Sequence, residues 1–415
     1  MIDGRQTFVR TTLIKLAAVC VLMSSCTAVS DDTGTNTGST AVSTETIAEE
    51  TTIEETTYTS SVTTSGSPVG TGDTTAETEL TETVTEPVPP ETEFDYTICF
   101  TGDISAADGA RTTNRWIAHG RDTSSCFDEM MMEHMQEADI CFANNEFPYS
   151  TRGAAIPNKD YTYRADPENV QLMLDLGVDI VSLANNHMYD YGPDALLDTL
   201  DTLDDAGILH IGAGKDIEEA SRTEFMELNG AKIAFINGTR VEWAELTKGA
   251  AEDSPGVFRT VDPTLLYQRV DEAREQADIV IVYMHWGTEG VEYLEGYQTE
   301  VGRGLIDHGA DAVIGDHTHC LQGIEFYKDA PIIYSLGNFW FNGRTQRTAL
   351  AEIHITGTRS DHTLELRYIP AMQSECTVYC ITSPDEQERY YRYLESISPN
   401  CVFDENGICT EKVVT

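Results

Sequence analysis

The chain has 415 residues and carries 70 Asp and Glu against 26 Lys and Arg, a formal net charge of −44 at pH 7. We expect no nucleic-acid partner and no direct adsorption to anionic polymers, because so acidic a chain is repelled by both. An anionic substrate would need a bound cation to neutralise the site locally.

The N-terminus has the layout of a bacterial lipoprotein signal. Three basic residues precede an apolar run at 16–23, which ends in Ser24-Ser25-Cys26. The run is too short to span about 30 Å of hydrocarbon, and an uncleaved anchor is therefore the weaker alternative to cleavage before a lipidated cysteine. The sequence predicts a signal peptide at 1–25, lipidation of Cys26, and a cell-surface protein attached by that lipid to the outer face of the bacterial cytoplasmic membrane.

The next stretch, residues 26–93, is rich in Thr, Ser, Glu and Gly and has no Lys or Arg. Such a composition cannot bury a core, so it predicts a disordered acidic tether. The remainder is long enough for one large domain, at 94–372, with a Cys-containing helical extension at 373–415 packed on it.

Eight cysteines follow Cys26, and none forms a CxxC pair, which argues against a zinc ribbon. Because an exported chain can oxidise its thiols, we expect disulfides among the four that cluster near the C-terminus: Cys376, Cys380, Cys401 and Cys409. Three others lie in or beside apolar strands and are expected to be buried, inert thiols: Cys99, Cys141 and Cys320.

Short apolar runs alternate with helical patterns along the folded part. The runs predict strands at 96–100, 139–143, 179–184, 232–236, 278–284 and 311–314, and amphipathic stretches predict helices at 166–176, 193–206, 262–276, 300–308 and 385–396. Later runs at 323–327, 331–335, 350–355 and 363–368 are typical of antiparallel strands. The predicted fold class is α/β, with mixed β-sheets sandwiched between helices.

Polar residues suited to metal or acid-base chemistry repeatedly follow an apolar strand. The segments are Gly102-Asp103, Asn144-Asn145-Glu146, Asn185-Asn186-His187, His285-Trp286-Gly287 and Asp316-His317-Thr318-His319. Because the carboxyl ends of parallel strands lie along one edge of a sheet, the five segments are predicted to converge on one cleft.

Each of these residues also has a purely structural interpretation. Asp103 could form a turn or a helix cap, and Glu146 could pair with an arginine. His187 could be a satisfied core histidine, and a lone His285 after a buried strand is more often structural. Independent structural needs do not explain why all of them fall at strand ends, so the joint pattern favours a site.

His317 and His319 alternate, and alternate residues of an extended chain point to the same side, within reach of one cation. Carboxylate and amide oxygens with imidazole nitrogens suit a catalytic divalent ion such as Mn, Fe or Zn better than a structural zinc.

The motifs together resemble the CapA family of bacterial capsule-synthesis proteins. The matching segments, in order, are Asn144-Asn145-Glu146, 182–187 with Asp190-Tyr191-Gly192, His285-Trp286-Gly287-Thr288-Glu289, 315–319 and 334–339. The resemblance covers about 95–400. It implies a metallophosphoesterase-like fold and a role in poly-γ-glutamate capsule synthesis.

The resemblance also implies a set of ligands for one or two ions: Asp103, Glu146, Asn186, His285, His317 and His319. Two departures from the phosphoesterase pattern stand out. Ser105 occupies the place of a histidine, and Glu146 replaces an aspartate, so the first metal site is one ligand short.

The expected chemistry is metal-assisted hydrolysis. His187, oriented by Asp190, would protonate the leaving group. Arg164, Glu289 and Asn338 would contact the substrate, although a surface salt bridge is as good an interpretation of Arg164, and a turn role a better one of Asn338.

The expected partners are an anionic polymer or its precursor and membrane synthase subunits. The sequence leaves two alternatives to a capsule hydrolase. One is a non-catalytic accessory subunit of a membrane complex that synthesises or exports the polymer. The other is a metallohydrolase that acts on another cell-envelope polymer.

Overall fold

The computed structural model describes residues 92–241 and 245–412. The predicted signal peptide, Cys26 and all but the last two residues of the predicted tether lie outside the described residues. Within the described ranges, no helix is long and apolar enough to cross a membrane. All of these residues belong to one structural unit, which begins at residue 84.

The larger of two mixed sheets has ten strands. Its order is β17-β18-β15-β14-β1-β2-β3-β4, with β13 beside β1 and β16 beside β15. The strands are β1 (Phe94–Ile104), β2 (Ile140–Asn145), β3 (Ile180–Ser182), β4 (Leu209–Ile211), β13 (Asn338–Trp340), β14 (Gln346–Gly357), β15 (His362–Ser374), β16 (Thr377–Cys380), β17 (Cys401–Phe403) and β18 (Ile408–Glu411). Strands β1 to β4 run parallel, whereas β14 and β15 are antiparallel.

The second sheet has six strands in the order β11-β12-β10-β9-β7-β6. They are β6 (Glu224–Leu228), β7 (Ala231–Thr239), β9 (Ile279–His285), β10 (Ala312–Asp316), β11 (Ile324–Tyr327) and β12 (Ala330–Ile333). Its inner strands β7, β9, β10 and β12 are parallel, and antiparallel strands close both edges. Strands β5 (Ala213–Gly214) and β8 (Gly256–Val257) form a separate pair.

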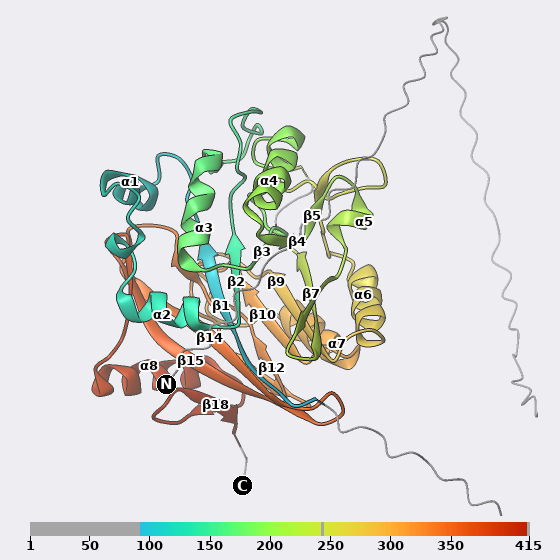
Figure 1. Ribbon diagram of the computed structural model, residues 1–415, viewed down its shortest axis with the longest axis vertical. Helices are drawn as coiled ribbons and strands as arrows, with labels where there is room; N and C mark the ends of the chain where they lie inside the picture. Colours follow the sequence, from blue (N-terminus) through green and yellow to red (C-terminus); the bar gives the residue numbers. More distant parts are fainter. Residues whose placement is uncertain (1–91, 242–244, 413–415) are drawn as a thin grey trace, which may run out of the picture. The chain divides into compact units, whose positions relative to one another are not determined.

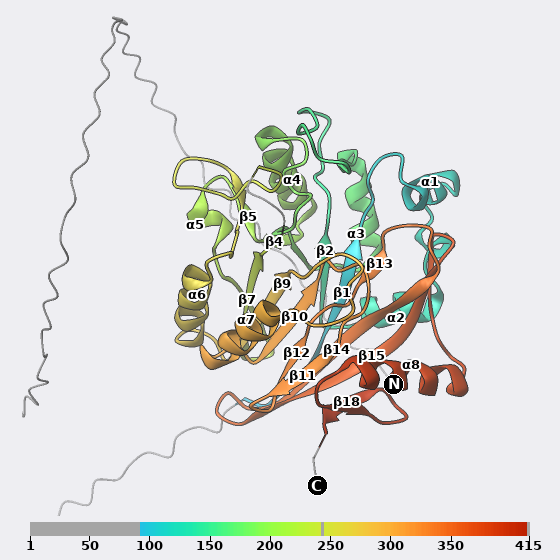
Figure 2. The same cartoon turned by 180° about the vertical axis from the view of Figure 1, so that it is seen from behind.

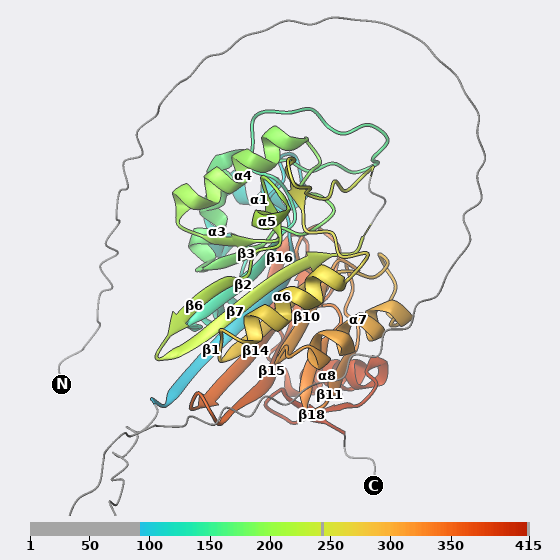
Figure 3. The same cartoon turned by 90° about the vertical axis from the view of Figure 1, so that its right-hand side faces the viewer.

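Helices cover the outer faces of the two sheets. The α-helices are α1 (Arg111–Ala118), α2 (Glu129–Glu137), α3 (Gln171–Leu176), α4 (Pro193–Ala206), α5 (Ile217–Ala220), α6 (Thr264–Arg274), α7 (Gly296–Asp307) and α8 (Pro384–Ile397), with 3-10 turns at Thr123–Ser125 and Pro167–Val170. Figures 1 and 2 show α2 and α3 on one side of the strands and α6 and α7 on the other. Figure 3, seen from the latter side, shows α6 running along β7.

Because successive side chains of a strand point to opposite faces of a sheet, the core consists of three apolar clusters. Phe100 and Phe142 of the larger sheet pack on Phe235 and Tyr283 of the smaller sheet, so one apolar cluster lies between the sheets. Cys99, Cys141 and other residues of opposite orientation pack under α1 to α4, and a third cluster lies under α6 and α7. The predicted α/β class, with mixed sheets between helices, is confirmed.

An aspartate precedes four of the parallel strands and caps the neighbouring strand. Each carboxylate accepts a backbone N–H across the sheet: Asp139 from Thr97, Asp179 from Cys141, Asp278 from Lys232 and Asp311 from Val280. Because a backbone N–H at a strand start otherwise lacks a ladder partner, these contacts fix the register from the amino end. That register sets which residues meet at the opposite, carboxyl edge.

The C-terminal residues are continuous with the larger sheet. The predicted boundary at 372/373 falls inside β15, and the chain after it adds β16, β17 and β18 to that sheet. Helix α8 packs through Tyr390, Tyr391 and Leu394 on the cluster between the sheets.

The prediction of disulfides among the four C-terminal cysteines is wrong in this structure. Cys376, Cys380, Cys401 and Cys409 are free thiols, and all four are buried. Cys401 and Cys409 share a hydrogen bond, and that bond, together with burial among apolar residues, raises the pKa of Cys409. These thiols therefore act as small apolar groups of the core.

Candidate metal centre

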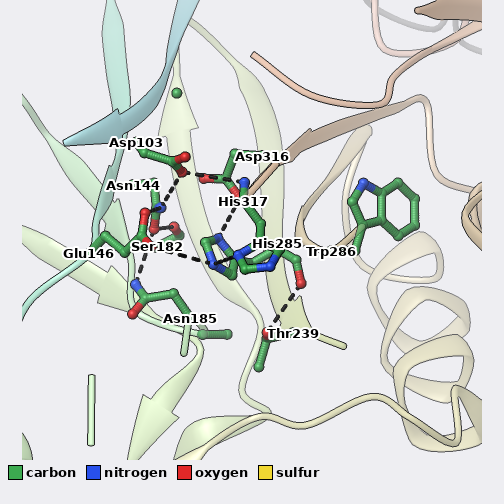
Figure 4. A network of polar contacts seen from close by, with 12 residues as sticks. Asp103, Asn144, Glu146, Ser182, Asn185, Thr239, His285, Trp286, Asp316 and His317 are labelled. Atoms are coloured by element: carbon green, nitrogen blue, oxygen red, sulfur yellow. Dashed lines mark hydrogen bonds and ion pairs between the residues drawn. The ribbon is translucent and has the colours of Figure 1, made fainter. Parts of the chain in front are cut away.

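The carboxyl ends of strands from both sheets meet at one buried site. Asp103 lies near the end of β1 and Glu146 directly after β2, in the larger sheet; His285 ends β9 and Asp316 ends β10, in the smaller. Figure 4 shows the four side chains pointing toward one another together with His317. The predicted convergence at strand ends therefore takes place between two sheets rather than along one.

One group of possible ligands consists of Glu146, His285 and His317, all buried, with one donor atom of each within 4.8 Å of the others. Nδ1 of His317 lies 3.0 Å from Nε2 of His285, and that Nε2 lies 2.8 Å from Oδ1 of Asn186 and 3.9 Å from Oε1 of Glu146. The donor atoms of three predicted ligands, Glu146, Asn186 and His317, thus surround Nε2 of the fourth, His285.

A second group consists of Asp103, Glu146 and His319. Nδ1 of His319 lies 2.9 Å from Oδ2 of Asp103. Asn338 pairs with Asp103 in the register of β1 and β13, and its buried side chain contacts His319. Because Glu146 belongs to both groups, its carboxylate lies where it can bridge two cations.

The turn that carries the two closing histidines differs from the prediction. His317 and His319 have φ angles of +90° and +55°, so the segment is not extended. The two imidazoles fall into different ligand groups, with ring centroids 6.0 Å apart. A positive φ in two non-glycine residues costs free energy, of order 1–3 kcal/mol each, and such strain is typical of functional sites.

Asp316 completes the centre by fixing His285. Its Oδ1 lies 2.7 Å from Nδ1 of His285, and its Oδ2 accepts a 3.0 Å hydrogen bond from the hydroxyl of Tyr283. With Nδ1–H donated to a carboxylate, Nε2 of His285 presents its lone pair to the cluster, as ligating histidines do.

The carboxyl groups cannot all ionise without a cation. Burial and the charge of Asp103 raise the pKa of Glu146 well above its usual value, and the same two causes raise that of Asp316. Burial also opposes ionisation of Asp103, yet the hydrogen bond and charge of His319 and the charge of His285 hold the pKa of Asp103 well below its usual value.

The pKa values of the three histidines are also shifted in different directions. Burial lowers the pKa of His285 to about 3 and, with the charge of His285, lowers that of His317 far below its usual value. His319 is the exception, because its hydrogen bond to Asp103 outweighs burial and raises its pKa. Two of the three imidazoles are thus neutral at pH 7, which is the form that binds metal.

Two buried side-chain oxygens without hydrogen-bond partners indicate that these residues fit a cation. Oε1 of Glu146 and Oδ1 of Asn338 are buried and have no hydrogen-bond partner, an arrangement that is costly unless another group occupies the site. The donor atoms are oxygens and imidazole nitrogens, and the nearby thiol of Cys320 points to Thr318 instead. This donor set fits a divalent metal ion.

His187 lies beside the two ligand groups rather than in them. Its Nδ1 is 2.7 Å from Oδ2 of Asp190, which leaves Nε2 facing Oε1 of Glu146 at 3.8 Å. Both side chains are buried. The pair has the geometry of an imidazole oriented by a carboxylate.

The three predicted substrate contacts have different surroundings. Asn338 lies in the centre, and the exposed Glu289 is close enough to raise the pKa of Glu146. The guanidinium of Arg164 instead donates to the carbonyl oxygen of Arg152 and lies 4.2 Å from the ring centroid of Tyr191. A structural role of Arg164 therefore explains its contacts better than the predicted substrate contact does.

Four further residues at the site had no role assigned from the sequence: Asn144, Lys159, Tyr163 and Asp316. The amide nitrogen of Asn144 donates to Asp103 at 2.9 Å and to Glu146 at 3.4 Å. Asn144 and Asp316 belong to strand-end segments, so their position was a usable signal. Lys159 and Tyr163 lie in a long loop, and no pattern in the sequence marks them.

Three curated relatives share sequence with the chain. It is 29% identical over 271 residues to a capsule biosynthesis protein CapA of Bacillus anthracis, covering 63% of this chain and 64% of the relative. It is 33% identical to a PGA biosynthesis protein CapA of Bacillus subtilis, with 48% and 52% covered, and 34% identical to a probable polyglutamine synthesis accessory protein of Mycobacterium tuberculosis, with 48% and 55% covered. The chain spans less than two thirds of the length of each.

Solved structures match more distantly. They include an NAD nucleotidase of Haemophilus influenzae (12% identity, TM-score 0.39, covering 74% of this chain and 57% of that one) and a putative 5'-nucleotidase of Staphylococcus aureus (17%, 0.37, 72% and 58%). TM-scores below 0.5 support no inference about activity.

A family model also matches the chain. The model that describes the bacterial capsule synthesis protein PGA_cap matches residues 97–343, more than half of the chain, and this range contains every residue of the two ligand groups. The chain therefore belongs to the bacterial capsule synthesis protein PGA_cap family.

Proposed function

We propose that this protein is a metal-dependent hydrolase of capsule polymer synthesis, acting on poly-γ-glutamate or its precursor at the bacterial cell surface. Membership of the family and the names of the Bacillus relatives support the capsule role. The observation that carries the hydrolase is the pair of ligand groups that share Glu146, whose Oε1 is buried and has no hydrogen-bond partner.

Each side chain has a definite task in this mechanism. The two groups would hold a divalent cation, which would supply Lewis-acid activation of the scissile group and of water. Asp316 orients His285, and Asn144 donates hydrogen bonds that hold Asp103 and Glu146 in place. His187 delivers a proton to the leaving group, with Asp190 fixing its ring.

The ligand types favour Mn, Fe or Zn over Mg or Ca, because imidazoles supply part of the donor set. Two groups around a shared carboxylate favour two ions over one. An acidic chain with a cation centre also explains how an anionic substrate could bind, since the cation offsets the local negative charge.

The test combines metal analysis with turnover. We expect the purified full chain to contain Mn, Fe or Zn by elemental mass spectrometry. We expect it to hydrolyse one of three generic probes, namely a phosphodiester, a phosphomonoester or a γ-glutamyl amide. Turnover of a peptidoglycan or teichoic-acid substrate, with none of these probes hydrolysed, would indicate that the enzyme acts on another cell-envelope polymer.

A non-catalytic accessory subunit of a membrane synthase or exporter is the second candidate. Ser105 stands where the phosphoesterase pattern has a histidine, and the mycobacterial relative is named as an accessory protein. A metal-loaded protein that turns over none of the probes but copurifies with membrane synthase subunits would favour this candidate.

Attachment at the cell surface belongs to the same proposal and rests on Cys26, at the end of the apolar N-terminal run. The substitution Cys26→Ala should release the protein from membranes, because the lipid is the proposed anchor. Fractionation of cells that express wild type or the variant measures this, and equal membrane association of the two would rule out lipidation as the anchor.

A further inference from the structure

A long loop lies against the metal centre. Residues 151–163 contain no helix or strand, and the loop's two ends are joined by backbone hydrogen bonds of Ala165 to Pro148 and of Ser150 to Ala165, both 2.9 Å. A loop with closed ends is held as a unit, so what it contacts between those ends decides where it sits.

Three of its residues bind Asp190. The N–H of Ile156 donates to the Asp190 carbonyl oxygen at 2.9 Å, and the N–H of Tyr163 donates to Oδ2 at 2.7 Å. Nζ of Lys159 lies 3.0 Å from Oδ1. Asp190, which orients His187 through the same carboxylate, is therefore also the attachment point of the loop.

Lys159 is the unusual member of this set. The residues on either side of it are exposed, yet only 4% of its own side chain is exposed, and its ammonium also donates to the carbonyl oxygen of Asn186. A buried lysine costs free energy unless it is paired. Two of its partners are the carboxylate behind His187 and the peptide that joins Asn186 to His187.

The same loop places the ring of Tyr163 against the imidazole of His187, the proposed proton donor. The ring of Tyr163 lies 4.2 Å from that of His187 and 5.6 Å from Phe341, which in turn lies 4.6 Å from His319. The rings connect the proton donor with the second ligand group, so the loop forms a wall of the site and not merely a surface connection.

We propose that Lys159 is a positioning residue, which fastens the loop 151–163 to Asp190 and thereby fixes the His187–Asp190 pair beside the metal centre. The inference rests on the proposed hydrolase function, in which His187 delivers the proton. Lys159 contacts the backbone oxygen of Asn186 and not its side-chain oxygen, which faces His285, so its loss should change the rate of the chemical step and leave the metal bound.

The experiment compares full-chain Lys159→Met, Lys159→Arg and the control Lys328→Met. Lys328 is an exposed residue paired with Asp307, and it lies in the turn before the amino end of β12, whereas the centre lies at the carboxyl ends of strands. Lys159→Met should lower kcat for bis(4-nitrophenyl) phosphate about 10- to 100-fold, as loss of a supporting contact does, with KM and metal content little changed. Lys159→Arg should recover most of the rate, and Lys328→Met should match wild type.

A second measurement does not depend on activity. Tyr161 is 71% exposed in the middle of the loop, so chymotrypsin cleavage after it reports loop release. We expect faster cleavage in Lys159→Met than in wild type and Lys328→Met.

The outcomes separate the two claims. A wild-type kcat in Lys159→Met overturns the positioning role and leaves the hydrolase proposal standing. Loss of metal from Lys159→Met overturns the positioning role as well, since Lys159 would then support the ligands. If wild type turns over no probe, the hydrolase fails, and cleavage decides alone: equal rates in wild type and Lys159→Met overturn the role of Lys159.

Discussion

The backbone N–H of Asp103 donates a 2.9 Å hydrogen bond to the carbonyl oxygen of Gly337. This bond ties the end of β1 to the turn before β13, and therefore places the carboxylate of Asp103 beside Asn338. The close approach is possible because Gly102 has no side chain: a Cβ there would lie 1.9 Å from the same carbonyl oxygen.

The substitution Gly102→Ala should consequently destabilise the fold by about 1–3 kcal/mol, because backbone has to move to admit the methyl group. The matched control is Gly296→Ala at the start of α7, where a Cβ meets nothing within 4 Å. We expect the control to lie within about 1 kcal/mol of wild type, on the stabilising side. Urea unfolding measures both, and equal midpoints for the two variants would contradict the steric argument.

Asp316 gives a second prediction. Asp316→Asn keeps the shape of the side chain but loses the charge that supports His285, so metal affinity should fall about 10- to 100-fold. Asp307→Asn, at an exposed ion pair with Lys328, should retain wild-type affinity. Competition against a chelator measures the affinities, and an unchanged value for Asp316→Asn would mean that His285 needs no carboxylate partner.

A third prediction concerns pH and the metal-free protein. The folded pKa of His285 is about 3, below the ordinary value of 6.5, so the unfolded state binds more protons in this range. The contribution of His285 to stability is therefore complete above pH 6.5 and is lost as pH falls toward 3. In the presence of a chelator, wild type should lose more stability over this interval than His285→Gln. Unfolding midpoints that fall in parallel would show that another group dominates.

Part of the fold was readable from the sequence because local signals and global packing agree. The predicted helix at 193–206 has the observed bounds of α4, with Pro193 in the first turn and Gly207 in the left-handed conformation after the last. Four predicted strands begin with an aspartate, and the structure shows that Asp139 and its three counterparts precede the observed strands and cap neighbouring ones. Strand-end position, together with the family resemblance, led to Glu146 and His285.

Other features depend on contacts that no local pattern encodes. Asp316 meets His285 because β10 and β9 align them in register, and the order of strands in a sheet is not written in either strand. Helix α2 was missed, although Asp128 caps it through the N–H of Met131, because its apolar periodicity is weak. Lys159 reaches the site only because its loop folds back on Asp190.

The prediction of disulfides among the C-terminal cysteines was wrong for a related reason. Closeness in sequence suggested pairing, but Cys376 lies in the β15–β16 turn and Cys380 ends β16, whereas Cys401 and Cys409 lie on the paired strands β17 and β18, where their thiols share a hydrogen bond. Strand pairing, not sequence spacing, decides which thiols meet.

The last prediction concerns the turn of His317, whose φ of +90° is the conformation that glycine adopts without strain. Replacement of His317 by Gly and by Ala removes the same imidazole, so both variants should lose metal from the group that contains Glu146 and His285. They differ in the backbone, because Ala retains a Cβ in a disfavoured conformation and Gly does not. In the presence of a chelator, His317→Gly should therefore be more stable than His317→Ala by about 1–3 kcal/mol.

Urea unfolding of the two chelated variants measures the difference, and elemental analysis checks that both have lost metal. Glycine normally lowers stability relative to alanine, because it leaves the unfolded chain more freedom, so the expected order is the reverse of the ordinary one. Ala above Gly in stability would mean that the turn relaxes once the imidazole is gone. Gly above Ala would mean that the backbone at His317 is held in a strained conformation, at a cost in stability that metal binding offsets.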